Sequence, residues 1–527
     1  MNERLIIMGL ITSTEFCKRI KPHWQPRLLE SSTAEELSIW CWQYYEEYKM
    51  APGKEIETIY FRKLTEGLDK EMAEEIEEEL LPDLSEEYLR TDFNVEHLVT
   101  ETKAHITGRK LLLVSERITD IVENGRGDYE ERLKDAEKLL EQYKSTPSSK
   151  DTSIDLGNAS SEENIRQAFR KAAQPVIRLP KQLGEFMNHQ CVPGGFLSFL
   201  APEKRGKTWI LMALGMTGVS QQKNVAMFQA GDMNEAEQIR RISSYLCRKP
   251  TMEKYAKEHW QPVRDCVHNQ LNECHKKERE CDFGVFEDMT LDKVLLLDYE
   301  ELEQAAIDNP DYKPCHNCTK YRREKCGAVW LEKVPDTDVI DEEEAVRAFT
   351  KFFVKNKRGF RLSTHANGTL SVKDMETILD TWEIEDGFVP DIIIVDYADL
   401  LVPSGGGQDF RQQQNTIWKD LRRLSQTKRQ DVLPLVITPT QADAQAYKSY
   451  RLELNNFSED KRKYAHVTAM YGLNQDPMGR EKKLGMLRIN EIIIREGEFS
   501  NGNEVTVLQN LKRGRPIIGS FFSINNK

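Results

Sequence analysis

Residues 194–232 read GGFLSFLAPEKRGKTWILMALGMTGVSQQKNVAMFQAGD, and this stretch decides the fold. The apolar run from Phe196 to Leu200 predicts a buried strand, which is followed by a tight loop ending in Gly206-Lys207-Thr208. An apolar-rich helix is expected from Trp209 to about Val219, and a second strand from Val225 to Phe228. A strand, a loop with Gly-Lys-Thr, a helix and a strand in this order are typical of a phosphate-binding P-loop.

The chemistry of such a loop explains its residue types. Backbone N–H groups at the helix N-terminus point at the phosphates, the lysine ammonium reaches the β and γ oxygens, and the hydroxyl helps to hold Mg²⁺. Ala201 departs from the usual pattern, which has a glycine there, and alanine restricts φ where glycine would not. An ordinary strand-to-helix turn with a surface lysine is the alternative interpretation. The residues expected around ATP are Ala201, Lys204, Arg205, Gly206, Lys207 and Thr208.

Length and composition bound the class of protein. A chain of 527 residues is too long for one core and predicts two or three domains. Its 39% hydrophobic and 31% charged residues are typical of a soluble globular protein, and no apolar run approaches the roughly 20 residues of a transmembrane helix. The N-terminal segment lacks a basic region, so we expect no signal peptide and a cytoplasmic location. With a net charge of −13, any nucleic acid must be held by a local basic surface.

The pattern of residues along the chain predicts the order of domains. Apolar residues recur at helical spacing through residues 1–145, which favours an all-α domain for oligomerisation or partner docking. A linker with a short amphipathic helix is expected at 146–175, because its first part is rich in Ser, Thr, Gly and Pro. An α/β domain is expected at 176–527, interrupted by a Cys-rich insertion at 251–335.

The cysteines suggest a metal site within that insertion. Six of the ten cysteines lie between Cys266 and Cys326, and clustering of this kind in an intracellular chain favours metal over disulfides. The spacing Cys315-His-Asn-Cys318 suits two corners of a tetrahedral structural zinc site. Cys326 and most simply Cys281 fill the others, with His316 and Cys274 as alternate ligands. A set of free, unreactive thiols is the alternative.

Two later strands end in polar residues suited to nucleotide chemistry. The apolar run Ile392 to Val395 ends at Asp396, which is the form of a Walker B strand whose carboxylate holds Mg²⁺, usually through water. The run LPLVITPTQ ends at Gln441, where a polar side chain can sense the γ-phosphate. A long polar stretch follows Gln441, and we expect a mobile loop that carries Lys448, Arg451 and Lys463.

The order of these parts resembles the DnaB-like replicative DNA helicases, phage versions included. The most specific segments are IIIVDYADLL (392–401), FRQQQNTIWKDLRRLSQTKRQDVLPLVITPTQAD (410–443) and GLNQDPMGREKKLGMLRINEIIIREGEF (472–499). The resemblance implies a RecA-like ATPase domain in each subunit of a homohexameric ring. ATP would lie between subunits, loops facing the channel would grip single-stranded DNA, and movement would run 5′ to 3′. A primase, a loader and other replisome proteins are the partners it implies.

The resemblance also implies roles for single residues. Lys207 and Thr208 would bind phosphates and Mg²⁺, Asp396 would hold Mg²⁺, and Gln441 would couple the γ-phosphate to the DNA loops. Asp232 stands where the family has its catalytic glutamate, although it also suits a helix cap, and Glu235 is a weaker candidate. Arg495 stands at the place of the arginine finger, with Lys512 and Arg513 as second choices. The DNA loops would be 403–411 and 444–463, with contacts from Arg411, Lys448 and Arg451.

Departures from the family pattern keep other functions open. Ala201 replaces glycine, Asp232 replaces glutamate, and Ile493 stands where the family often has lysine. Because aspartate is shorter by one methylene, its carboxylate would fall roughly 1 Å short of the attacking water, and misplacement on that scale can cost about 100-fold in rate. A catalytically weak RecA-like scaffold that binds nucleotide or DNA is therefore the main alternative, and a recombination or repair ATPase is another.

Overall fold

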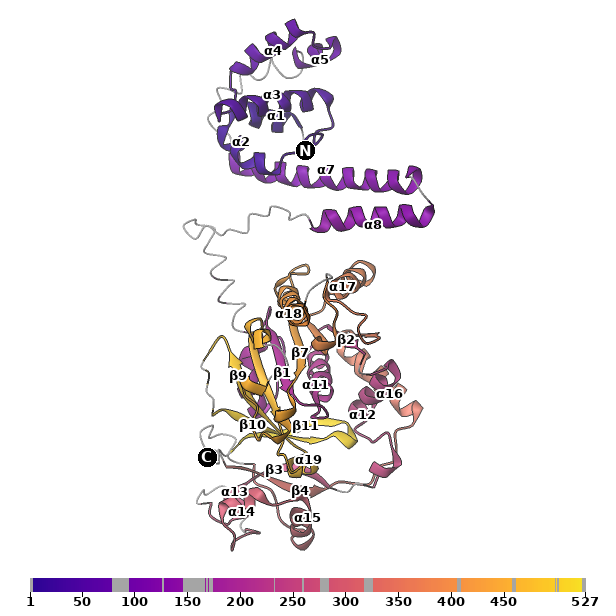
Figure 1. Cartoon of the computed structure of the whole chain (residues 1–527), viewed down its shortest axis with the longest axis vertical. Coiled ribbons are helices and arrows are strands. Elements are labelled where there is room, and N and C mark those ends of the chain that lie inside the picture. The colour runs from indigo at the N-terminus through magenta and orange to yellow at the C-terminus, as the bar shows by residue number, and fades with distance from the viewer. Residues whose placement is uncertain are drawn as a thin grey trace. The chain divides into compact units, whose positions relative to one another are not determined.

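The computed structural model of the chain describes residues 3–77, 94–125, 128–145, 166, 169, 174–231, 233–257, 260–274, 284–316, 326–404, 409–456, 461–497, 499 and 502–523. The chain divides into two compact units, Met1–Asn158 and Ala159–Lys527 (Figure 1). Within the described ranges, no helix combines the length and the apolar character needed to cross a membrane. Most of the predicted linker at 146–175, including its short helix, lies outside these ranges.

The described part of the first unit is helical, as predicted. Its core is built from buried aromatic and aliphatic side chains such as Phe16, Trp40 and Tyr60. Ser31 starts the third helix, because its side chain accepts a hydrogen bond from the backbone N–H of Ala34. The helices are α1 (Glu3–Thr12), α2 (Thr14–Ile20), α3 (Ser32–Tyr48), α4 (Glu55–Glu66), α5 (Lys70–Glu75), α7 (Val95–Asn124) and α8 (Tyr129–Ser145).

The second unit is built on one large sheet with the strand order β11-β10-β9-β8-β1-β7-β6-β2-β5. The six strands β8, β1, β7, β6, β2 and β5 run parallel to one another. Strands β9, β10 and β11 extend the sheet beyond β8 as an antiparallel edge. The strands are β1 (Phe196–Ala201), β2 (Val225–Ala230), β5 (Phe360–His365), β6 (Ile392–Asp396), β7 (Leu435–Gln441), β8 (Ala469–Asn474), β9 (Met486–Ile494), β10 (Glu504–Asn510) and β11 (Arg515–Phe522).

The parallel part of this sheet places the functional strand ends side by side. Carboxyl ends of parallel strands meet at the same edge of a sheet, and ligands bind there in open α/β folds. Strand β7 lies between β1 and β6, so Gln441 is flanked by the end of the P-loop strand and the end of the Asp396 strand. Ala201 and Gln441 are register partners. The sheet therefore brings together the three sequence motifs that were expected to contact nucleotide.

Helices cover both faces of the sheet and bury a separate core on each (Figure 1). One core contains apolar side chains of α10 (Lys181–Met187) and α11 (Lys207–Ser220), and the other contains those of α17 (Val372–Asp386) and α18 (Phe410–Gln426). Trp418 of α18 is fully buried against Phe196 of β1, with ring centroids 5.5 Å apart. Two further helices, α12 (Glu235–Cys247) and α16 (Glu342–Asn356), pack against each other.

The Cys-rich insertion forms a small subdomain around a two-stranded antiparallel sheet of β3 (Trp260–Cys266) and β4 (Gly327–Lys333). Short helices α13 (Val267–Gln270), α14 (Leu291–Leu296) and α15 (Tyr299–Asp308) surround it, and α19 (Arg480–Lys483) contacts it. The two-stranded sheet is fixed to the C-terminal edge of the main sheet, since Arg515 Nη1 donates to Gln261 Oε1 at 2.8 Å. Gly327 has no side chain to obstruct Phe521, whose ring would lie 2.3 Å from an added Cβ.

Candidate nucleotide-binding site

The loop after β1 has the local geometry of a P-loop. Gly206 caps α11 with φ of 80°, and no side chain caps the N-terminal N–H groups of that helix. These groups are therefore available to donate hydrogen bonds to an anion at the N-terminus of the helix. Ala201 needs no glycine conformation, because it is the last residue of β1 and pairs with Gln441. The left-handed backbone that the tight turn requires is supplied instead by Lys204, with φ of 60°, and by Gly206.

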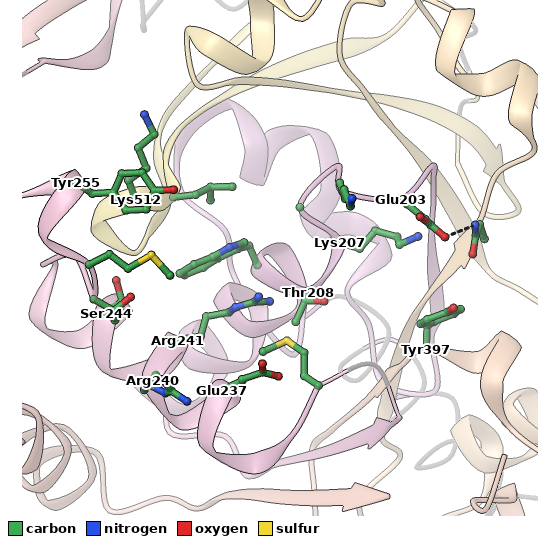
Figure 2. A pocket seen from close by; sticks show the side chains of 18 residues that line it. Glu203, Lys207, Thr208, Glu237, Arg240, Arg241, Ser244, Tyr255, Tyr397 and Lys512 are labelled. Atoms are coloured by element: carbon green, nitrogen blue, oxygen red, sulfur yellow. Dashed lines mark hydrogen bonds between the residues drawn. The ribbon is translucent and has the colours of Figure 1, made fainter. Parts of the chain in front are cut away.

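A cavity of about 830 Å³ opens over this loop, within the size range of small-molecule sites. Figure 2 shows Lys207 directed toward Glu203 and Tyr397 at one side of it, with Tyr255 and Lys512 at the opposite side. The lining residues include the cations Lys204, Lys207, Arg240, Arg241 and Lys512 and the carboxylates Glu203 and Glu237. This excess of positive charge suits a polyanion even though the whole chain is acidic.

The described carboxylates of the cavity have different surroundings. Glu237 closes a capping box at the start of α12: its side chain accepts from the backbone N–H of Asn234, whose side chain accepts from that of Glu237. Glu203 accepts a hydrogen bond from Gln441 Nε2 at 3.2 Å. The carboxylate that contacts Gln441, which was expected to sense the γ-phosphate, is thus Glu203, a residue that the sequence did not single out.

Gln441 belongs to a network that extends away from the cavity. Asp399 Oδ2 accepts hydrogen bonds from the Gln441 backbone N–H at 3.0 Å and from the Thr440 hydroxyl at 2.8 Å. Its other oxygen, Oδ1, forms an ion pair with Lys463 Nζ at 2.7 Å. The sequence placed Lys463 in a mobile basic loop, but only 1% of its side chain is exposed, and its ammonium pairs with the partly buried Asp399 carboxylate.

A second contact joins the P-loop to the same polar segment. The backbone N–H of Glu203 donates to the Tyr447 hydroxyl at 3.1 Å. Tyr447 lies in the 3-10 turn Ala444–Lys448, which begins where Asp443 accepts a hydrogen bond from the backbone N–H of Ala446. The described part of residues 444–463 is therefore a series of anchored turns and not the mobile loop expected from its polar composition.

The remaining residues expected around phosphate and Mg²⁺ take different positions. Thr208 lines the cavity. Asp396 ends β6 and is 1% exposed, and the cavity wall at this point is formed by its neighbour Tyr397. Arg205 points away from the cavity, since its Nη1 donates to the Gln475 carbonyl at 2.6 Å. Burial lowers the pKa of its guanidinium. Asp232 lies outside the described residues.

The three cations considered for the arginine finger lie in different environments. Arg495 is exposed at the end of β9, and its guanidinium hydrogen-bonds the Ala465 carbonyl. Lys512 lines the cavity of its own chain, with Nζ 5.5 Å from the centre of the Tyr255 ring. Arg513 is 5% exposed and donates to the Pro335 carbonyl at 2.9 Å, so it does not suit a role at a neighbouring subunit.

The basic residues expected to contact DNA lie on two separate segments. Arg411 is exposed in the first turn of α18, and Lys448 is exposed at the end of the 3-10 turn that carries Tyr447. Arg451 is half-buried, with Nη2 3.5 Å from the Asn503 carbonyl. The middle of the expected 403–411 loop, residues 405–408, lies outside the described residues.

Only part of the expected zinc set falls within the described residues. Cys315 and Cys326 meet in a buried cluster, and the third member is Cys266, which the sequence did not assign as a ligand. Cys281 and Cys318 lie outside the described residues. In the ranges that are described, no group of three or more His, Cys, Asp or Glu side chains is arranged to hold a metal ion.

The far side of the cavity contains aromatic residues that sequence motifs could not identify. Tyr255 lies there, and Arg241 stands over the Trp209 ring with 5.0 Å between the guanidinium carbon and the ring centre. Met252 and Leu511 add apolar surface. Aromatic and apolar side chains close to a cation-rich phosphate site suit a ligand with both a planar ring and phosphates.

Comparison with known proteins supports the fold described above. No protein-family model and no curated protein sequence matches this chain. The structure of a DnaB-like replicative helicase, described with its interactions with primase, is similar over 99% of this chain and 98% of its own length, with 12% identity and a TM-score of 0.53. A second solved structure, an isolated ATPase domain, matches over 70% of this chain and 100% of its own length, with 13% identity and a TM-score of 0.43. The chain therefore has the fold of that DnaB-like replicative helicase structure, in which an α/β unit built on a mostly parallel sheet follows an all-helical unit.

Proposed function

We propose that this chain is an ATP-dependent DNA helicase that moves along single-stranded DNA. The observation that carries this proposal is the pair of contacts made by Glu203. Its carboxylate accepts from Gln441, and its backbone N–H donates to Tyr447 of the segment expected to contact DNA. If binding or loss of the γ-phosphate moved Glu203, the segment that carries Tyr447 would therefore be displaced as well. Such coupling is what a translocating ATPase requires.

ATP and Mg²⁺ are the cofactors that the site fits. The N-terminus of α11 and Lys207 offer donors to phosphate, while the Thr208 hydroxyl and the Asp396 carboxylate are hard oxygen donors of the kind that Mg²⁺ prefers. Because Asp396 is buried behind the cavity wall, we assign it a contact through water. The metal would supply charge neutralisation at the phosphates, and Lys207 would stabilise the charge that develops on them.

The residue that orients the attacking water is assigned to Asp232, with Glu203 as a second candidate. Asp232 follows β2, whose neighbour in the parallel sheet is the Asp396 strand. Glu203 is favoured by its place in the cavity wall and its hydrogen bond to Gln441. A carboxylate in either place can accept a hydrogen bond from water in line with the γ-phosphate.

The oligomeric state and the partners that we propose are those implied by the resemblance to DnaB-like helicases. We propose a homohexamer in which Arg495, exposed at the end of β9, reaches the nucleotide of the neighbouring subunit. Arg411, Lys448 and Arg451 would contact the DNA backbone, with movement 5′ to 3′. The fold neighbour was described with primase, and we extend a primase partner, a loader and other replisome proteins to this chain as proposals.

A RecA-like scaffold that binds nucleotide or DNA without unwinding is the second candidate function. It is favoured by the turned-away Arg205 and by aspartate at position 232 in place of glutamate. A nucleotide site that hydrolyses ATP slowly or not at all would still allow ring assembly and DNA binding. A repair or recombination ATPase would share the same cavity, so activity assays are needed to separate the candidates.

The deciding experiment measures ATP hydrolysis by the full chain with and without single-stranded DNA, together with unwinding of a fork that has a 5′ tail. We expect DNA to stimulate hydrolysis and Lys207→Ala to reduce it at least about 100-fold, because it removes a donor at the transferred phosphate. Lys428→Ala, an exposed lysine outside the cavity, is the matched control and should retain activity. Ring assembly without any hydrolysis would favour the scaffold.

A further inference from the structure

Gln229, the last residue but one of β2, carries a buried amide that forms no hydrogen bond with the described part of the chain. Its exposed fraction is 0%, and neither its Nε2 nor its Oε1 has a partner among the residues that the structure describes. Burial of a polar group without a hydrogen bond is destabilising, and the large majority of buried side-chain polar atoms are bonded. The presence of glutamine at this position therefore calls for a reason other than packing.

The alternation of side chains along the strands sets the direction in which this amide points. Met227 of β2 belongs to the core that includes the apolar side chains of α11, so Gln229, two residues later, lies on the same face of the sheet. Ile394 of β6 belongs to that core as well, which places the Asp396 side chain on this face. Gln229 and Asp396 are register partners on adjacent parallel strands. Their side chains are therefore neighbours on one face.

The path of α11 brings the first turn of this helix to the same end of the strands. Gly215 lies over Ile394, because a Cβ added to it would be 3.0 Å from Ile394 Cδ1. Gly218, further along the helix, lies over Ile392 in the same way, with 2.5 Å to its Cδ1. The helix therefore runs opposite to β6, and its N-terminus lies toward the carboxyl end of that strand. Thr208, in the first turn, is thus close to the sheet edge at which β6 ends.

A second buried amide on this face is also incompletely bonded. Gln238 of α12 is 0% exposed, and its Nε2 donates to Met227 Sδ at 3.4 Å, which is a weak acceptor. Its Oε1 has no hydrogen-bond partner within the described ranges. Because Met227 stands two residues before Gln229, both amides lie over the same part of β2. Unused hydrogen-bonding groups thus gather beside the strand that carries Asp396.

We propose that Gln229 is a positioning residue for Asp396: when Mg²⁺ and ATP are bound, its Nε2 donates a hydrogen bond to the Asp396 carboxylate and fixes the orientation of that group. The proposal rests on the function proposed above, which assigns Asp396 to the Mg²⁺ site. Carboxylates that bind metals are themselves held by hydrogen bonds from neighbouring side chains. A neutral amide suits this task, because it orients the carboxylate without neutralising the charge that attracts the cation.

Fluorescent-nucleotide titration of the full chain, done once with Mg²⁺ and once with EDTA, tests this role. Gln229→Met removes the donor and keeps a side chain of similar size. We expect its Kd for ATP with Mg²⁺ to rise about 10-fold to 100-fold, the effect of losing a hydrogen bond that supports a metal ligand. The Kd in EDTA should stay unchanged. Without nucleotide, the Tm should be unchanged or higher, because an apolar group of similar shape replaces an amide that has no partner.

Gln182→Met is the matched control, since Gln182 is a buried glutamine of α10 that does not line the cavity. It should leave the Kd for ATP unchanged in both buffers. Gln229→Leu, a second apolar replacement, should behave like Gln229→Met, so the result does not depend on the folding of one variant. A Kd with Mg²⁺ equal to that of the wild type in either folded variant overturns the proposal. A rise of the same size in EDTA overturns it as well, because the effect would then not involve the metal.

These binding measurements do not depend on catalysis, so they separate the role of Gln229 from the proposed helicase activity. A wild-type chain that binds ATP with Mg²⁺ but neither hydrolyses it nor unwinds DNA would contradict the helicase, while the Kd values of Gln229→Met still decide the role of Gln229. Wild-type ATP binding that is equally tight with Mg²⁺ and with EDTA would overturn the positioning role even if hydrolysis were observed.

Discussion

Lys463 Nζ lies 2.7 Å from Asp399 Oδ1, and this ion pair of a buried lysine with a partly buried carboxylate joins two segments that are distant in sequence. Asp399 follows the Walker B strand, and its second oxygen holds Thr440 and Gln441 at the end of β7. Lys463 belongs to the 3-10 turn Lys461–Ala465, within the segment assigned to DNA contact. The pair therefore fixes that segment to the strand that ends in Gln441, the residue expected to sense the γ-phosphate.

Lys463→Met tests how strongly this pair holds the two segments. Removing Lys463 leaves the charge of the partly buried Asp399 carboxylate uncompensated, so we expect the free energy of unfolding to fall by up to about 3 kcal/mol, the lower end of the range for buried pairs. Denaturant unfolding of the full chain, followed by a probe in the second unit, measures it. Lys448→Met, an exposed lysine of the same segment, should change stability by less than about 0.5 kcal/mol. Similar values for both variants would contradict a structural role for the pair.

Gln441→Ala tests the contact between β7 and the P-loop. It removes the hydrogen bond to Glu203 but leaves the backbone bond to Asp399. We expect stimulation of ATP hydrolysis by single-stranded DNA to fall roughly tenfold, the size of a typical coupling free energy, while nucleotide affinity changes little. Gln445→Ala, at an exposed site in the adjacent turn, serves as the control. Parallel loss of basal and stimulated rates would place Gln441 in the chemical step instead.

The strands that position the site could be predicted from sequence because their signals are local. The buried strands β1, β6 and β7 are short apolar runs. Strand β1 ends at Ala201, where the expected P-loop begins, and β6 and β7 end at Asp396 and Gln441, which were expected to act at the nucleotide. Gly206 and Lys207 could be recognised from spacing alone. The sequence also predicted the helical first unit and the terminal antiparallel strands, because periodicity extends over each of these elements.

The contacts that connect the site could not be predicted in this way. Asp399 and Lys463 are 64 residues apart, and Glu203 and Tyr447 are 244 apart, so their pairing depends on how the sheet is ordered. Polar composition suggested a mobile loop after Gln441, yet buried side chains such as Lys463 anchor it. The meeting of Cys266 with Cys326 could not be predicted either, because no C-x-x-C spacing marks Cys266 and only the β3–β4 register brings the two residues together.

Gly514→Ala tests the wall of the cavity opposite the P-loop. Gly514 has φ of 62°, and a Cβ there would lie 2.2 Å from the carbonyl carbon and oxygen of Ser244, which are backbone atoms. Ser244 and the neighbouring Leu511 both line the cavity, so the strain should be relieved by moving that wall. We expect a loss of stability of about 1–3 kcal/mol and weaker ATP binding. These effects are measured by thermal unfolding and by fluorescent-nucleotide titration.

The control for this substitution is Gly519→Ala in β11. No atom lies within 4 Å of a Cβ built at Gly519, and its φ is outside the left-handed region. That variant should bind ATP like the wild type. Equal effects of the two substitutions on nucleotide affinity would show that the approach of Gly514 to Ser244 does not shape the cavity.

Tyr255→Ala tests whether the far side of the cavity binds the nucleotide base. Tyr255 lies opposite Lys207 in the cavity, and Lys512 Nζ stands 5.5 Å from its ring centre (Figure 2). Stacking of a base on an aromatic ring contributes about 1–3 kcal/mol, so the Kd for ATP should rise roughly 5-fold to 150-fold. Tyr255→Phe keeps the ring and should bind ATP nearly as the wild type does.

Inorganic tripolyphosphate lacks a base, so competition by this compound should be unchanged in Tyr255→Ala. A matching loss for ATP and tripolyphosphate would mean that the substitution damages the phosphate site, and that Tyr255 does not contact the base.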